Sequence, residues 1–115
     1  MSDTFYGRFV KEMFKSNTGD IFAAEEYLSC YGLTHAAMGV AGEAGEVVDL
    51  LKKTIFTGKR LYVDEIIKEL GDLEFYLEAL RQQLHITRDE VLNANWRKLS
   101  ERHGDNKVEE YYSEE

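Results

Sequence analysis

The chain has 115 residues, of which 43% are hydrophobic and 12% aromatic, and its formal net charge is −8. This hydrophobic content excludes a disordered chain. The negative charge argues against a nucleic acid polymer as partner, since non-specific binding to DNA or RNA depends on basic surface. It would also repel a free triphosphate, so a polyphosphate substrate would have to come with a metal ion. The absence of proline, with long Leu-, Glu- and Lys-rich stretches, favours an all-α fold.

The single cysteine, Cys30, cannot form an internal disulfide, which favours a reducing compartment. No stretch approaches the roughly 20 apolar residues of a membrane span, and the first residues, Met-Ser-Asp-Thr, do not resemble a signal peptide. We therefore expect a cytoplasmic protein with no membrane partner. A chain of this length buries about 65% of the surface that it exposes when unfolded, so its core is thin. Because thin cores are often completed by oligomerisation, a homodimer or homotetramer is expected.

The first predicted helix covers residues 4–15, where apolar side chains recur at helical spacing. Turn-forming residues at 16–20 end it, and a short helical piece is expected near residues 21–28. A second long helix should begin near Thr34, as its N-cap, and end near Phe56, with Gly58 at the C-terminal cap.

The third predicted helix covers residues 63–84, with Asp64 and Glu65 in its first turn. A capping box at residues 87–90 should open a fourth helix that ends near His103. Short connections favour antiparallel packing, so we expect a four-to-five-helix antiparallel bundle as a single domain over residues 1–104. Residues 105–115 form an acidic C-terminal tail without a core pattern.

Two pairs of carboxylates stand among small and apolar residues: Glu43 with Glu46, and Glu69 with Asp72. Residues three apart differ by about 60° around a helix, so each pair points to one side. The neighbouring glycines, at positions 42, 45 and 71, each cost about 1 kcal/mol in a helix, which indicates close packing or room for a ligand. A single such pair is usually a solvated helix face, whereas two facing pairs predict a Mg²⁺ site, or a Mn²⁺ site.

The order and spacing of these residues resemble the all-α, MazG-like nucleoside triphosphate pyrophosphohydrolases. The resemblance rests on Glu43-Ala-Gly-Glu46, 22 intervening residues and Glu69-Leu-Gly-Asp72. It extends to Asp49, to the lysines at 52 and 53, to Tyr76-Leu77 and to the Asn95-x-x-Lys98-Leu99-x-x-Arg102 pattern. The resemblance implies an all-α fold, magnesium bound by the four carboxylates, hydrolysis of a nucleoside triphosphate to the monophosphate and pyrophosphate, and assembly as dimers or tetramers.

Candidate substrate contacts follow from helical positions. Lys53 lies on the acidic face and could bind phosphate, although an ion pair with Asp49 is the simpler alternative. Asn95, Lys98 and Arg102 lie within about 60° of one another and suit phosphate oxygens, or else form a solvated edge.

Three aromatic or histidine side chains leave alternatives open. Tyr76 faces the acidic cluster, so its hydroxyl could bind phosphate or its ring could pack in the core. Trp96 suits packing better than base stacking, and His35 could contact the nucleotide or be structural.

The chemistry expected of such a site is metal-assisted displacement. Glu46, with Glu43 as the second candidate, would act as general base on the attacking water. That the water attacks near the α-phosphorus is what the resemblance implies. Two alternatives remain open: a hydrolase of guanosine polyphosphate alarmones, and a non-catalytic helical module whose acidic cluster only binds a cation.

Overall fold

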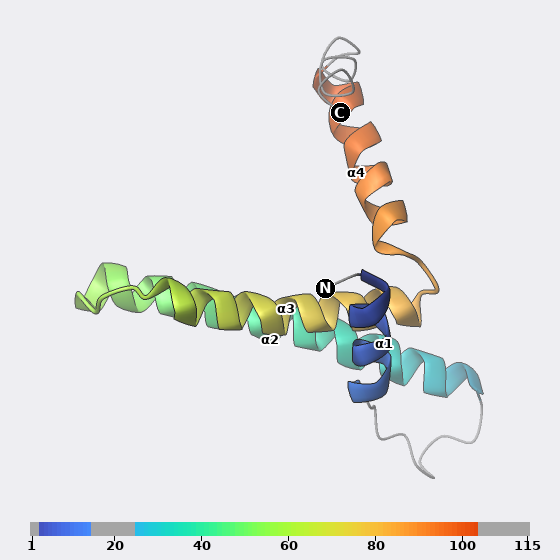
Figure 1. Ribbon diagram of the computed structural model, residues 1–115, viewed down its shortest axis with the longest axis horizontal. Helices are drawn as coiled ribbons and strands as arrows, with labels where there is room; N and C mark the ends of the chain where they lie inside the picture. The colour runs from blue at the N-terminus through green and yellow to red at the C-terminus, as the bar shows by residue number, and fades with distance from the viewer. Residues whose placement is uncertain (1–2, 15–24, 104–115) are drawn as a thin grey trace. The chain divides into compact units, whose positions relative to one another are not determined.

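The computed structural model describes residues 3–14 and 25–103. They form four helices and no strand: α1 (Asp3–Met13), α2 (Glu25–Thr57), α3 (Val63–Gln83) and α4 (Arg88–His103) (Figure 1). The predicted all-α fold class is therefore confirmed. No helix in this part of the chain is long and apolar enough to cross a membrane.

The chain divides into two compact units, Met1–His85 and Ile86–Glu115, and α4 belongs to the second. The place of α4 in a bundle and the predicted domain boundary remain predictions. The turn expected at 16–20 and the acidic tail at 105–115 lie outside the described residues.

Helix α1 packs against α3 through one side of its surface. Val10 of α1 is fully buried together with Ala36 of α2 and Ala79 of α3, and these are the fully buried hydrophobic residues of the described ranges. The side-chain amide of Gln82 donates a 2.7 Å hydrogen bond to the carbonyl oxygen of Gly7. This bond and the small core hold α1 across the end of α3 that lies farthest from the α2–α3 turn.

The predicted start of the second long helix, near Thr34, was wrong. Helix α2 runs without interruption from Glu25, so Thr34 is an exposed residue inside the helix and not its N-cap. Gly32 is buried against the side chain of Gln83, where a Cβ atom would collide with the amide, and Ala36 is buried one turn later. Packing of these small residues on α3 outweighs the weak helix propensity of residues 29–32. The sequence pattern alone therefore did not place these residues in the long helix.

Helices α2 and α3 lie side by side and antiparallel, joined by a short turn (Figure 1). Gly58 follows α2 with φ of +72°, the left-handed conformation expected of a C-terminal cap, and the amide of Lys59 donates to the carbonyl oxygen of Lys53 at 3.4 Å. This turn fixes the register of the two helices, and the register determines which carboxylates face each other.

Helix α4 opens with the predicted capping residues. The hydroxyl of Thr87 accepts a 3.1 Å hydrogen bond from the amide of Glu90 and donates to the Glu90 carboxylate at 3.3 Å. Before it, His85 holds a left-handed φ of 56° after the end of α3, and its amide donates to the carbonyl oxygen of Gln82.

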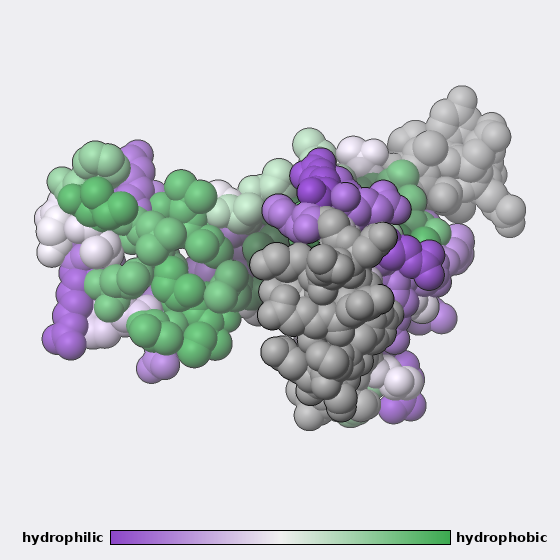
Figure 2. Space-filling view, turned by 90° about the horizontal axis from the view of Figure 1, so that it is seen from above, coloured by the Kyte–Doolittle hydropathy of each residue, from purple (hydrophilic) through white to green (hydrophobic). Residues whose placement is uncertain are grey.

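Many large hydrophobic side chains of α2 and α3 remain exposed. The exposed fraction is 62% at Val48, 71% at Ile55, 68% at Val63 and 47% at Leu70. Figure 2 shows hydrophobic side chains gathered over the part of the α2–α3 pair that ends in the connecting turn. Within the described residues, much of the apolar surface of this helix pair is therefore exposed.

Candidate metal centre

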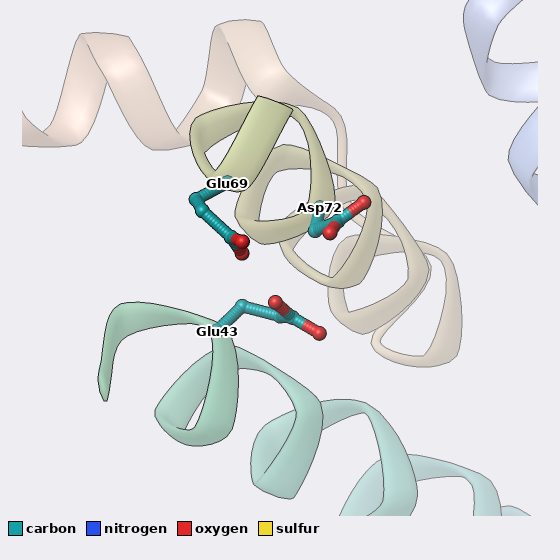
Figure 3. Close-up of side chains that lie close together, drawn as sticks. All are labelled: Glu43, Glu69 and Asp72. Atoms are coloured by element: carbon teal, nitrogen blue, oxygen red, sulfur yellow. The ribbon is translucent and has the colours of Figure 1, made fainter. Parts of the chain in front are cut away.

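Three of the four predicted carboxylates meet between α2 and α3. Glu43 of α2 points towards Glu69 and Asp72 of α3, and one oxygen from each lies within 4.8 Å of the other two (Figure 3). Glu43 and Glu69 are half-buried and Asp72 is exposed. We call these residues the carboxylate triad. Three hard oxygen ligands at this separation suit a small divalent cation such as magnesium or manganese.

The carboxylates of the triad lie close together, so their negative charges repel one another. Burial raises the pKa of the Glu43 carboxyl, and the negative charges of Asp72, Glu69 and Glu46 raise it further. A bound cation would offset these negative charges and favour the ionised form of Glu43.

Glu46 lies one turn beyond Glu43 and is exposed. Helical geometry places it about 60° from Glu43 on the side of α2 that carries Asp49 and Lys53. It contributes to the field at Glu43 but is not one of the three grouped carboxylates. Its role as a metal ligand or general base remains a prediction.

The glycines beside the triad do not serve close packing among the described residues. A Cβ atom at Gly42, Gly45 or Gly71 would meet no atom of the described chain within 4 Å. Among the described residues, no neighbouring helix approaches these glycines closely, and the open space leaves room for a ligand. The space at Gly42 and Gly45 opens on the same side of α2 as Glu46.

Lys53 makes the ion pair that was the alternative to phosphate binding. Its ammonium group lies 2.9 Å from the carboxylate of Asp49, and both side chains are roughly half exposed. The hydrogen bond and charge of Lys53 lower the pKa of Asp49, and the same contact raises the pKa of Lys53. A triphosphate would have to compete with Asp49 for this ammonium group.

Tyr76 packs in an aromatic cluster one turn from the triad. Its ring centroid lies 5.4 Å from Phe75, 6.3 Å from Phe14 and 6.2 Å from His35. The ring lies against Gly39, where an added Cβ atom would overlap three ring atoms. The core-packing alternative therefore accounts for the Tyr76 ring. Sequence reasoning missed Gly39, although its position four residues before Glu43, on the same helix face, was a usable signal.

The proposed basic strip lies on α4, in the second unit. Asn95, Lys98 and Arg102 are all exposed, whereas Trp96 is half-buried. The triad belongs to the first unit and this strip to the second, and the contacts of the strip with substrate remain predictions.

Three carboxylates that converge from two antiparallel helices form a candidate site for a divalent cation in an all-α protein. Comparison with known families makes this specific. Residues 33–106 match the MazG nucleotide pyrophosphohydrolase domain, and the chain belongs to that family. The match covers α4 and most of α2, as well as all of α3.

A curated relative is the Gene 37 protein of Mycobacterium phage L5. It is 33% identical over 78 residues, which cover 64% of this chain and 68% of the phage protein. The comparison with solved structures finds no match.

Proposed function

We propose that the protein is a magnesium-dependent nucleoside triphosphate pyrophosphohydrolase that converts a ribo- or deoxyribonucleoside triphosphate and water to the monophosphate and pyrophosphate. The observation that carries the proposal is the carboxylate triad, in a chain that belongs to the MazG nucleotide pyrophosphohydrolase family. No separate structural observation favours the two alternatives, hydrolysis of guanosine polyphosphate alarmones and cation binding without catalysis. The test below distinguishes both of them from the proposal.

The donor set fits the metal that the reaction requires. Glu43, Glu69 and Asp72 supply three oxygen ligands within reach of one ion, and burial together with the neighbouring negative charges raises the pKa of Glu43, which a cation would counter. Mn²⁺ would fit the same oxygens. A divalent cation held here would neutralise the carboxylates and draw electron density from phosphate oxygens.

Glu46 is the proposed general base. It is exposed, lies outside the triad and borders the open space at Gly42 and Gly45, so it is free to accept a proton from water. Glu43 is the second candidate, and its raised pKa is the direction that suits a proton acceptor near neutral pH.

Positive groups of the chain would offset charge on the pyrophosphate leaving group. Lys53 is proposed for this role, in which it would leave its ion pair with Asp49 and bind phosphate instead. Further phosphate contacts are proposed for Asn95, Lys98 and Arg102. Arginine is suited to this because its guanidinium binds phosphate in a bidentate manner. The Tyr76 hydroxyl remains a candidate contact, although its ring is held by the aromatic cluster.

The test is a panel of canonical and modified ribo- and deoxyribonucleoside triphosphates, together with guanosine polyphosphates, each incubated with and without Mg²⁺. We expect magnesium-dependent release of pyrophosphate and nucleoside monophosphate from one or more triphosphates. Selective hydrolysis of guanosine polyphosphates would favour the alarmone alternative. Cation binding without hydrolysis of any member would favour the non-catalytic module and overturn the proposal.

The site assignment is tested by Glu43→Gln and Asp72→Asn, which preserve shape and remove charge. Each should lower kcat/KM by about 100-fold or more, because the cation loses one of three ligands. Asp64→Asn is the matched control, since Asp64 is an exposed carboxylate in the first turn of α3 and outside the triad. Equal activity of the triad variants and the control would contradict the assignment.

A further inference from the structure

Helices α2 and α3 face each other in one antiparallel register that runs into the carboxylate triad. Three pairs of facing residues follow this register: Gly32 with Gln83, Gly39 with Tyr76, and Glu43 with Asp72. From each pair to the next, α2 advances by seven and then by four residues, and α3 goes back by the same two numbers. The triad therefore lies in the same α2–α3 contact as the packed glycines, one helical turn beyond Gly39 and Tyr76.

The contact between Gly39 and Tyr76 is a close approach of a ring to a helix backbone. A Cβ atom on Gly39 would overlap three atoms of the Tyr76 ring, so the ring lies directly on α2. The ring also meets Phe75 and Phe14 edge-on, at interplanar angles of 86° and 88°, and its centroid lies 6.2 Å from that of His35. With these neighbours around it, the ring has little room to move and acts as a spacer between the two helices.

Two opposing forces act on the separation of α2 and α3 near the triad. The carboxylates carry like charges within 4.8 Å of one another, and their repulsion favours separation of the helices. Burial of Ala36 against Ala79 draws the helices together. The three glycines beside the triad make no close contact within the described residues, so they do not set the distance. The Tyr76 ring limits how closely α2 can approach α3 one turn away.

We propose that Tyr76 is a positioning residue of the metal site, whose ring on Gly39 sets the separation of α2 and α3 at which the triad binds a cation of the size of Mg²⁺. Oxygen ligands lie about 2.0–2.1 Å from Mg²⁺ and about 2.3–2.6 Å from Ca²⁺, and Mg²⁺ demands the more regular geometry. A small outward displacement of α2 therefore disfavours Mg²⁺ more than Ca²⁺. The inference deepens the proposed function and rests on its cation, not on hydrolysis of nucleotide.

The ring of Tyr76 carries this role, and the hydroxyl does not. The atoms that a Cβ atom on Gly39 would overlap are Cγ, Cδ1 and Cε1 of the ring, and phenylalanine retains all three. Tyr76→Phe should therefore bind Mn²⁺ as the wild type does. This separates the positioning role from the phosphate contact proposed for the hydroxyl, which would act only when nucleotide is bound.

The experiment titrates the metal-free full chain with Mn²⁺ alone, followed by electron paramagnetic resonance, and then displaces the bound Mn²⁺ with Mg²⁺ or Ca²⁺. Gly39→Ala should weaken binding of Mn²⁺ and Mg²⁺ about tenfold or more, because the added methyl group pushes α2 away from the ring. Binding of Ca²⁺ should weaken by no more than about threefold. A folded Gly39→Ala chain that binds Mn²⁺ as the wild type does, or that loses Mg²⁺ and Ca²⁺ equally, would overturn the proposal.

Gly32→Ala is the matched control. Gly32 lies in the same helix contact, and its added Cβ atom would overlap the side-chain amide of Gln83. That amide is the end of a flexible side chain that can swing aside, and Gly32 lies about three turns from Glu43. Gly32→Ala should therefore bind Mn²⁺ as the wild type does. Equal weakening in the two alanine variants would mean that general loosening of the helix pair, and not the Tyr76 ring, controls the site.

A double-mutant cycle keeps the proposal testable if circular dichroism shows that Gly39→Ala does not fold. Tyr76→Leu removes the ring and should itself weaken Mn²⁺ binding about tenfold. Adding Gly39→Ala to Tyr76→Leu should weaken binding by no more than about threefold further, because the ring that the methyl group would overlap is gone. Binding of Mn²⁺ by Tyr76→Leu at the wild-type affinity would refute the role of the ring.

Failure of this inference is distinguishable from failure of the proposed function. A protein that shows these differences in Mn²⁺ binding but hydrolyses no nucleotide refutes the proposed function alone. An active protein whose Gly39→Ala and Tyr76→Leu variants bind Mn²⁺ as the wild type does refutes the inference alone.

Discussion

Gly39 gives the sharpest stability prediction, because a single added methyl group at this position meets an aromatic ring that cannot easily move. The Cβ atom of Gly39→Ala would overlap the ring of Tyr76, which is packed edge-on against Phe75 and Phe14. Overpacking of this kind costs about 1–3 kcal/mol. Alanine returns about 1 kcal/mol of helix propensity. We therefore expect a net loss of up to about 2 kcal/mol.

The control is the same substitution at Gly42 and Gly45, where the added Cβ atom meets no described atom within 4 Å. These variants should gain about 0.5–1 kcal/mol from helix propensity alone. Urea denaturation of the metal-free protein, followed by circular dichroism, measures all three on one scale. A Gly39→Ala protein that is as stable as Gly42→Ala would refute the packing argument.

The remaining predictions concern the helix ends and the charge of the triad. Thr87→Ala should cost about 1 kcal/mol and lower the helicity measured by circular dichroism, because Glu90 loses the hydroxyl that caps α4. His85→Gly should stabilise the chain by up to about 1 kcal/mol in thermal melts, since glycine adopts φ of +56° without steric cost. The raised pKa of Glu43 means that the folded state binds this proton more tightly than the unfolded state. Without metal, stability should therefore fall as pH rises from the ordinary carboxyl range through the raised value, and melts of Glu43→Gln should lack this component.

Much of the helical framework could be predicted because its signals are local. Gly58 has the left-handed conformation expected of a helix cap, and the third helix starts at Val63 as its acidic first turn indicated. The start of α2 could not be predicted in this way. Burial of Gly32 and Ala36 depends on side chains of α3 and α1 that lie far away in the sequence.

For the site, the sequence could predict which residues share a face of a helix. The convergence of Glu43 with Glu69 and Asp72 follows from helical spacing and the length of the turn between α2 and α3. Glu46 lies outside this group because it is rotated by about 60° around α2 from Glu43. Sequence spacing gives this angle but does not show which of the two side chains faces α3. Spacing also could not decide whether Lys53 faces phosphate or Asp49, because the outcome depends on side-chain conformation.

The central claim is that the triad holds a divalent cation for attack of water on the α-phosphorus of a nucleoside triphosphate. The most direct measurement is hydrolysis in ¹⁸O-labelled water with Mg²⁺, followed by mass spectrometry of both products. We predict one labelled oxygen in the nucleoside monophosphate, unlabelled pyrophosphate, and loss of both products in Glu43→Gln and Asp72→Asn. Label in pyrophosphate, or full turnover by either variant, would contradict the account.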